Sequence, residues 1–442
     1  VAFSVTGGDE LLFANREFSG AKHYNYLFDC GNYLNANSCT EDFFWRGVHN
    51  TIFFVIFQVG LMIFFSLLTA VILNKKIIGR GFFRSVFFFP VLLSPVVVGL
   101  IWQWILLKNG ILNAFIEANG GDKFSFLTDP GWAMTSSIFV SIWAHMGFYT
   151  LIVLAGLQAI PPNLYEAAEM DGTSRERTFF RITLPLLMPN LLVVFILASI
   201  KGVQTFDEIY VLTGGGPGTS TSLIVQYIFT TGFASSGSVQ NFGLAAAASM
   251  VLGIVLLLLT LIQLYLSRSR ENKHQEIKMG NTESLVKKIV TQKKYKEKYH
   301  WTDYFSYFYL FLGVFLMFGP IIWLGLSSVK TLAGIQEYPP TILPLSQIQV
   351  EVDGYEKPLS LYNVTLEDGS TTELAEIKRV GITSKMVDPK DTDKTYKIPI
   401  DKREKIREFS VQWDNYLDPL RKYNFLLYFK NSIFVTVIAT II

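Results

Sequence analysis

Long uninterrupted apolar segments are the feature that most restricts what this chain can fold into. A helix needs about 20 mainly apolar residues to cross the ~30 Å hydrocarbon layer of a bilayer. Such runs are apolar around the whole helix circumference, so the sequence predicts an all-α polytopic membrane protein. A shorter seventh run begins at Ser432 and reaches Ile442, which we interpret as a truncated span. The six full-length runs are Ile52–Leu73, Ser85–Leu107, Trp132–Ile160, Ile182–Thr205, Phe242–Leu266 and Tyr304–Val329.

Composition excludes several other classes of protein. Half of the 442 residues are hydrophobic, 17% are charged and the net charge is +2. Ordinary soluble domains carry about 25% charged residues. A disordered or nucleic-acid-binding chain is excluded because hydrophobicity is high and net charge is low. The two cysteines are too few for a disulfide scaffold or a structural zinc site. We therefore expect no metal site.

The distribution of Lys and Arg predicts the orientation of the spans. The loops at 74–84 and 161–181 and the linker at 267–300 together carry 17 Lys and Arg. The alternate loops at 108–131 and 206–240 carry two. Because short cytoplasmic loops are enriched in positive charge, the first set is predicted to be cytoplasmic. Both ends of the chain suggest an internal piece of a longer protein. No initiator Met or signal peptide is present, and the last span is short.

Polar segments divide the chain into membrane units. Cys30 and Cys39 lie in a turn-rich outer segment, where either a local disulfide or two free thiols would fit. The run HNTIFFVIF from His49 resembles KNSIFVTVI from Lys430, which suggests that a second membrane unit repeats the first. We predict an extracytoplasmic segment at 1–47 after a missing first span, a first unit of five spans at 48–267, a basic cytoplasmic linker at 268–303 and a second unit at 304–442.

Residues from about 345 to 425 differ from the rest of the chain. The alternating stretch IQVEV and the turn signals at Asp353-Gly354 and Asp368-Gly369 are typical of hairpins. This region is therefore predicted to be a small β-rich extracytoplasmic insertion.

The loop at 161–189 is predicted to form two short helices joined by a tight turn. Asp171-Gly172 breaks the first helix, because glycine adopts the left-handed conformation at little cost. Thr173 and Glu176 are predicted to form the capping box that opens the second helix. Two later prolines mark the return into the membrane. A capped, compact pair of helices on the cytoplasmic side suggests a docking surface.

This loop resembles a known family motif. Glu166-Ala167-Ala168, then Gly172, Ile182, Leu184 and Pro185 match the EAA motif of permease subunits of binding-protein-dependent ABC importers. The flanking sequences GRGFFRSVFFFPVLLSPVVVGLIW and FDEIYVLTGGGPGTST are similar to the carbohydrate branch, the maltose-type and multiple-sugar permeases. Residues 301–344 and the segment FKNSIFVTVIATII look like the first two spans of the partner permease, so two subunits look fused.

The resemblance implies a mechanism and a set of partners. The EAA loop would dock on a dimer of separate ATP-binding subunits, which use ATP and Mg, so this chain itself would bind no cofactor and be no enzyme. An extracytoplasmic solute-binding protein would deliver the sugar, and the spans would alternate access across a bacterial or archaeal plasma (inner) membrane. No Walker A motif is present in this chain. The implied coupling residues are Glu166, Ala167, Ala168, Asp171, Gly172, Arg175, Ile182 and Pro185.

Polar side chains within the spans are candidates for substrate contacts, because they are costly in hydrocarbon. Ser141, His145 and Phe148 share one helix face by their i, i+4, i+7 spacing, and Lys201 and Thr205 are one turn apart. In the carbohydrate branch the pocket is lined from these same two helices. A bundle histidine would equally explain His145, and a snorkelling side chain would explain Lys201.

The same residues bear on other possible cargoes, energy sources and sites. Lys201 would suit glycerol phosphate or another polyol derivative as cargo of the same importer class. An ion-coupled secondary transporter would need acidic residues inside spans, and none is found there. Asp207 and Glu208, as neighbours on an expected loop, show no acid/base geometry. The glycines at 214–218 lack a following GK[ST], so they are read as a turn and not as a phosphate loop.

Overall fold

The structure is a computed structural model, and it forms two compact units that are described separately. Unit 1 is Val1–Lys108 with Gly121–Pro320, and unit 2 is Asn109–Gly120 with Ile321–Ile442. Gly354, Asp368-Gly369 and most of the predicted basic linker lie outside the described residues. These are 2–7, 16–75, 77–233, 240–278, 301–331, 334–335, 337, 340–353, 355, 358–366, 370–389, 391–422 and 425–441.

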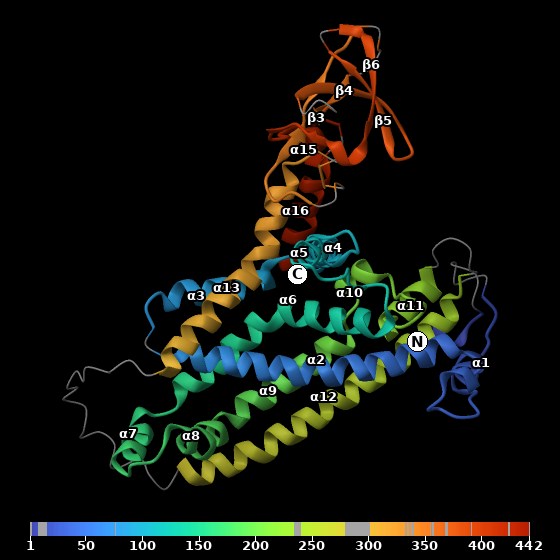
Figure 1. Ribbon diagram of the computed structural model, residues 1–442. Coiled ribbons are helices and arrows are strands. Elements are labelled where there is room, and N and C mark those ends of the chain that lie inside the picture. The colour runs from blue at the N-terminus through green and yellow to red at the C-terminus, as the bar shows by residue number, and fades with distance from the viewer. Residues whose placement is uncertain are drawn as a thin grey trace. The chain divides into compact units, whose positions relative to one another are not determined.

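Helices dominate the described residues of unit 1 (Figure 1). Within the described part of the chain, six helical stretches are long and apolar enough to cross a membrane, which confirms the predicted polytopic class. They are α2 (Asp42–Asn74), Pro95–Ala118, α6 (Pro130–Ala159), Arg175–Val203, the apolar part of α12 (Phe242–Lys278) and α13 (Trp301–Ser328).

The second span differs from its prediction. Ser85–Leu107 is not one helix but α3 (Arg80–Phe88), a 3-10 turn at Phe89–Leu92 and α4 (Pro95–Leu106). The break falls at Ser94, whose backbone is extended (φ −61°, ψ 135°). Pro95 causes it, because proline clashes with a helical conformation of the preceding residue. Hydropathy could not show this break, since every residue around it is apolar or small.

Two other helix ends also differ from prediction. The short α5 (Ile111–Ala118) of unit 2 follows α4 along the chain. The last helix, α16, runs over Phe425–Ile441 and so begins before Ser432. Lys430 lies inside it, because a single lysine at the end of an apolar run does not interrupt helix hydrogen bonding.

Helix α6 is the most buried span of unit 1. Two of its glycines permit close approach of neighbouring helices, one to a backbone and one to a side chain. A Cβ on Gly147 would lie 2.2 Å from the carbonyl oxygen of Phe87 in α3. A Cβ on Gly156 would lie 2.5 Å from the Asn190 side chain of α9 (Leu184–Val203). Helices in lipid associate by such close packing at small residues, because lipid supplies no hydrophobic drive between them.

A compact outer segment covers one end of unit 1. Cys30 and Cys39 form a disulfide, which settles the alternative that the sequence left open. Leu27 of α1 (Lys22–Phe28) is fully buried. It packs in one cluster with Phe44 of α2 and Tyr227 of α11 (Ile224–Phe233). The short 3-10 turns Ala2–Val5 and Ala36–Ser38 complete this segment.

Unit 2 contains the predicted β-rich region. Its main sheet has the antiparallel order β2-β3-β4-β5-β6, with β7 paired to β3, while β1 pairs with β8. Buried side chains lie on both faces of the sheet, with Val364 and Leu374 in one cluster and Val387 and Ala375 in the other. The elements are β1 (Leu345–Gln347), β2 (Gln349–Val350), β3 (Leu359–Thr365), β4 (Thr371–Val380), β5 (Thr383–Asp388), β6 (Asp391–Pro399), a 3-10 turn (Ile400–Lys402), β7 (Arg403–Lys405), β8 (Arg407–Phe409) and α15 (Asp414–Lys422).

One carboxylate joins four strands of this sheet. Glu376 of β4 pairs with Arg403 of β7 and accepts hydrogen bonds from Ser384 Oγ (2.6 Å) and Tyr362 Oη (3.0 Å). Burial acts to raise the pKa of Glu376, but hydrogen bonds from Ser384, Arg403 and Tyr362 outweigh it and hold that pKa below its ordinary value. The carboxylate therefore stabilises the sheet in its ionised form.

Glu376→Gln is expected to destabilise the sheet by about 3 kcal/mol, because it leaves a largely buried guanidinium without its counter-charge. Faster hydrogen exchange of the β4 amides in the full chain would measure this loss. The wild-type advantage should be complete above the ordinary glutamate pKa and should shrink as the pH falls through the lowered folded pKa. Glu404→Gln, at an exposed position on β7, is the control, and equal effects of the two changes would contradict the assignment.

Candidate functional site

The loop predicted to dock a partner begins with α7 (Pro162–Met170). The helix ends as predicted at Asp171-Gly172, where Gly172 has φ +65°. The Thr173 amide donates to Ala168 O (2.9 Å) and the Gly172 amide to Glu169 O (3.0 Å). These two bonds form a complete Schellman motif, which satisfies carbonyls at the end of α7. Glycine is needed here because a side chain disfavours the left-handed backbone.

The second half of the loop differs from the prediction. Ser174, not Thr173, caps α8 (Arg175–Thr178), and its side chain accepts from the Arg177 amide. This helix is not separate, because a π-helical segment (Phe179–Thr183) continues it directly into α9. The wider turn precedes Pro185, which lacks the amide for a regular helical bond. The loop is thus one free helix followed by the first turns of a span.

Most side chains of this loop are exposed. Glu166, Asp171, Arg175 and Pro185 are on the surface, Ile182 is half-buried and Ala168 is buried. Met170 is 88% exposed and Phe180 is 65% exposed. Exposed large apolar side chains on a projecting, capped loop are characteristic of a binding surface. The Tyr165 and Thr183 hydroxyls are hydrogen-bonded (3.1 Å), which joins α7 to the start of α9.

A second group of candidate residues lies on the spans, with His145 near the middle of α6 and Lys201 in the last turn of α9. His145 of α6 hydrogen-bonds through Nδ1 to Ser141 O (2.9 Å), so Nδ1 carries the proton and Nε2 is directed elsewhere. Helix α6 packs against both α9 and α10 (Asp207–Thr213), so His145, Lys201 and Glu208 lie on three neighbouring helices. The shared role of His145 and Lys201 as substrate contacts stays a prediction. We call His145, Lys201 and Glu208 the polar cluster.

The remaining predicted substrate residues have different surroundings. Ser141 is buried beneath His145. Thr205 is also buried, and its hydroxyl donates to Lys201 O (3.0 Å), so it supports the helix end that carries Lys201. Phe148 is 44% exposed on the outer surface of unit 1 and is not shown to join the cluster.

Glu208 is the residue that sequence reasoning missed. The segment was expected to be a loop, whereas it forms α10 between Phe206 and Gly214. Glu208 is 1% exposed, and no hydrogen-bond partner of its Oε1 is found among the described residues. A buried carboxylate atom without a partner is costly and marks a place where a ligand can bind. The signal was available, because Glu208, Ile209 and Leu212 share the spacing of one buried helical face.

The glycine-rich segment after α10 is a closed turn. The Gly216 amide donates to Thr213 O (3.1 Å), and the Thr221 amide donates to Gly215 O (3.1 Å). Gln226 Nε2 donates to Gly214 O (2.8 Å). These backbone groups bind within the turn, so they do not form a phosphate cradle.

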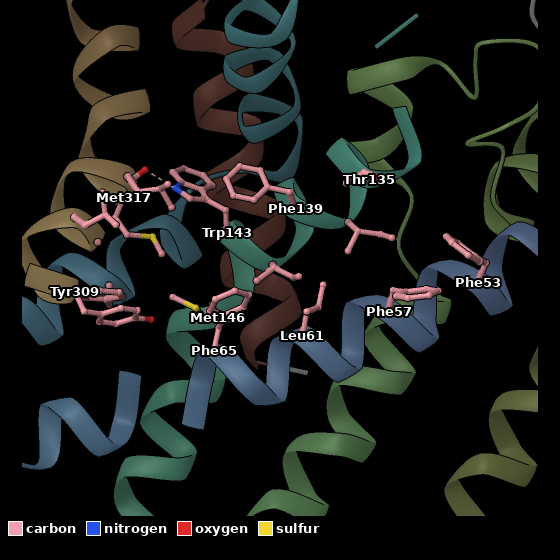
Figure 2. A pocket seen from close by; sticks show the side chains of 16 residues that line it. Phe53, Phe57, Leu61, Phe65, Thr135, Phe139, Trp143, Met146, Tyr309 and Met317 are labelled. Atoms are coloured by element: carbon pink, nitrogen blue, oxygen red, sulfur yellow. Dashed lines mark hydrogen bonds between the residues drawn. The ribbon is translucent and has the colours of Figure 1, made fainter. Parts of the chain in front are cut away.

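An apolar cavity of about 530 Å³ lies on another face of α6 (Figure 2). Phe57 and Leu61 of α2, Trp143 and Met146 of α6 and Tyr309 of α13 contribute to its wall. None of the five predicted substrate residues lines it. The polar cluster and the cavity are thus two distinct features of the same helix. Among the described residues, no group of three or more His, Cys, Asp and Glu is suited to a metal ion.

Comparison with known proteins identifies the family. Residues 62–272 match the family described as binding-protein-dependent transport system inner membrane component. The chain is 36% identical over 244 residues to the trehalose/maltose transport system permease protein MalF of Thermococcus litoralis, covering 54% of this chain and 80% of that protein. It is 32% identical over 256 residues to the sulfoquinovosyl glycerol transport system permease protein SmoG of Agrobacterium fabrum, covering 58% and 78%.

A solved structure is also similar to part of the chain. It is the crystal structure of a bacterial alginate ABC transporter in complex with an alginate pentasaccharide-bound periplasmic protein. The TM-score is 0.49 at 25% identity, over 57% of this chain and 83% of that one. The sequence relatives show that this chain belongs to the binding-protein-dependent transport system inner membrane component family, which confirms the resemblance read from the loop at 161–189. It is a multi-pass protein of the inner membrane.

Gly172→Ala is expected to weaken the end of α7 by about 1 kcal/mol, because an L side chain resists the left-handed backbone. Hydrogen exchange at the Thr173 amide should accelerate about fivefold. Gly60→Ala, inside α2 with open space around the new methyl group, is the matched control. The same substitution should leave protection unchanged or increase it there, because alanine favours a helix interior. Unchanged exchange at Thr173 would contradict the assignment.

Proposed function

We propose that this chain is the permease of an ATP-driven importer of sugars or oligosaccharides. The observation that carries the proposal is the joint placement of an exposed coupling loop and a buried polar cluster on the same two spans. Helix α6 carries His145 and leads directly into α7, while α9 begins in the loop and carries Lys201. Movement of the loop would therefore act on both sides of the cluster.

The dimensions of the two helices fit this role. At a rise of 1.5 Å per residue, His145 lies about 21 Å from the end of α6 at Ala159. Lys201 lies about 28 Å from Ile182 on the same basis. The cluster is therefore far from the loop along both helices. Rigid helices can transmit a displacement over this distance, as rocking of bundles around a central site requires.

The loop is the proposed contact with a separate dimer of ATP-binding subunits, which would use ATP and Mg. Glu166 and Arg175 offer charges of both signs, and Met170 offers an exposed apolar side chain. Desolvated apolar anchors beside charged groups are typical of specific interfaces. The Tyr165–Thr183 bond would pass movement of α7 to α9. An extracytoplasmic solute-binding protein would deliver the cargo, as the family description implies.

A sugar is the best-supported class of cargo. The relatives are named for trehalose and maltose and for sulfoquinovosyl glycerol. The cluster offers a carboxylate acceptor, an imidazole nitrogen and an ammonium donor, which match the hydroxyl groups of a sugar. Glycerol phosphate or another polyol derivative is less suited, because the Glu208 carboxylate offsets the positive charge of Lys201. Membership of a binding-protein-dependent family favours ATP over an ion gradient as the energy source.

The segment from α13 to α16 is proposed to begin a second, partner-type permease unit fused to the first. Helix α13 follows the basic linker, and α16 repeats the sequence pattern of α2. The β-rich region lies between these two helices in the chain.

Glu166→Lys is expected to reduce uptake of labelled maltodextrin by about tenfold or more, because reversing a charge at an interface costs 2 kcal/mol or more. Reconstituted proteoliposomes holding the complete complex would measure uptake and ATP hydrolysis together. Hydrolysis that continues while uptake falls would show uncoupling. Glu351→Lys, an exposed position in unit 2, is the control. Wild-type uptake by the Glu166 variant would refute the coupling role.

Glu208→Gln is expected to lower uptake at least tenfold, since a hydrogen bond to a charged group contributes about 1.5–3 kcal/mol. Its exposed neighbour provides the matched control Asp207→Asn, which should transport normally. The variant should still assemble with its ATPase and retain hydrolysis, because the loop is unchanged. Equal uptake by both variants would remove Glu208 from the substrate site.

A further inference from the structure

A basic pair and the apolar cavity of unit 1 lie along one stripe of α3. Arg80, Arg84 and Phe87 recur at spacings of four and three residues, so they share one helix face. The Phe87 ring lines the cavity and stacks on Tyr309 with centroids 6.3 Å apart. The stripe thus runs from two cations into an apolar space.

The Arg84 guanidinium has buried donors for which no acceptor is found among the described residues. These donors are its Nε and Nη2 atoms. Burial, together with the nearby charge of Arg80, lowers the pKa of the Arg84 guanidinium. An anion placed between the two arginines would satisfy these donors and remove the repulsion between the cations.

Polar groups at the start of α13 pair with groups at the end of α2 and in the loop after it. Lys75 Nζ donates to Ser306 Oγ (2.9 Å), and the Thr69 and Tyr309 hydroxyls are hydrogen-bonded (2.7 Å). The Ile78 amide donates to the Tyr307 hydroxyl (3.4 Å). Tyrosines and lysines are typical of the interface between headgroups and hydrocarbon. In Figure 1 the first turns of α3 and α13 lie at the same end of unit 1 as α7.

The cavity suits a hydrocarbon chain. Its walls are apolar, with Leu316 and Trp143 fixed to each other by a hydrogen bond from Trp143 Nε1 to Leu316 O (2.9 Å). Phe57, Leu61 and Leu312 form a rim that is about half exposed, so the cavity opens toward the membrane. Water is unstable in such a space, because it finds too few polar partners. Lipid acyl chains are the molecules present at that depth.

We propose that the crevice formed by α2, α3, α6 and α13 binds one anionic phospholipid. Its phosphate binds Arg80 and Arg84, and one acyl chain occupies the cavity beside Trp143 and Leu312. The sequence of cationic, interfacial and apolar groups along the crevice matches that of a phospholipid. Basic pockets between membrane helices bind anionic headgroups by this combination of charge and burial. The bound lipid would join α13 to the first permease unit.

Lipid retention tests the proposal on the full chain. The protein is reconstituted in vesicles of equal phosphatidylglycerol and phosphatidylcholine, extracted in mild detergent and analysed by native mass spectrometry. We expect one retained phosphatidylglycerol per chain, enriched about 25-fold over phosphatidylcholine, because each of the two arginines near a membrane surface contributes about fivefold. Arg84→Gln and Arg80→Gln should each reduce this enrichment about fivefold. Leu312→Trp should reduce retention of both lipids by filling the cavity.

Two matched controls separate the site from general effects. Arg46→Gln removes a charge from a surface ion pair with Asp42. Leu257→Trp enlarges an exposed apolar residue on α12. Neither should change retention. The proposal is overturned if Arg84→Gln and Arg46→Gln retain phosphatidylglycerol with the same enrichment, or if Leu312→Trp and Leu257→Trp retain the same amount of lipid. It is also overturned if cysteine cross-linking from position 312 captures another polypeptide instead of lipid.

Discussion

The close packing of helices around α6 is the constraint on which the rest of unit 1 depends. Gly147 leaves no room for a methyl group against the α3 backbone, and Gly156 packs directly against the Asn190 side chain of α9. In lipid, burial of apolar surface does not by itself hold helices together, so such contacts must supply the packing. They fix α6 between α3 and α9. A larger residue at Gly147 would push α6 away from the α3 backbone.

That packing connects the two ends of the proposed mechanism. Helix α6 ends at the loop at 161–189, and α9 begins there through an uninterrupted π-helical segment. The two spans pack together and carry His145 and Lys201, and the short helix that follows carries Glu208. A π segment beside prolines is a place where a helix can adjust without losing its hydrogen bonds entirely. It therefore lies where a coupling movement would enter the membrane.

Much of this molecule could be predicted from its sequence. The apolar runs predicted the membrane class, and the Asp171-Gly172 pair predicted the end of α7, because both depend on local composition and backbone preference. The prediction of the second span as one helix was wrong, because Pro95 breaks a run of residues that is continuously apolar. Glu208 was overlooked because its segment was expected to be a loop, although the spacing of Glu208, Ile209 and Leu212 fits one buried helical face. The cap of α8 was predicted at Thr173 and lies at Ser174, one position later.

The sequence by itself determined the membrane class, the approximate position of most spans and the family. Each of these depends on residues close together in the chain, where spacing and polarity fix the outcome. Only the tertiary structure decided which polar groups meet, that Cys30 and Cys39 are bonded, and that an apolar cavity lies beside α13. These features depend on contacts between residues far apart in sequence, and such contacts form only when helix packing selects one face of each helix over the others.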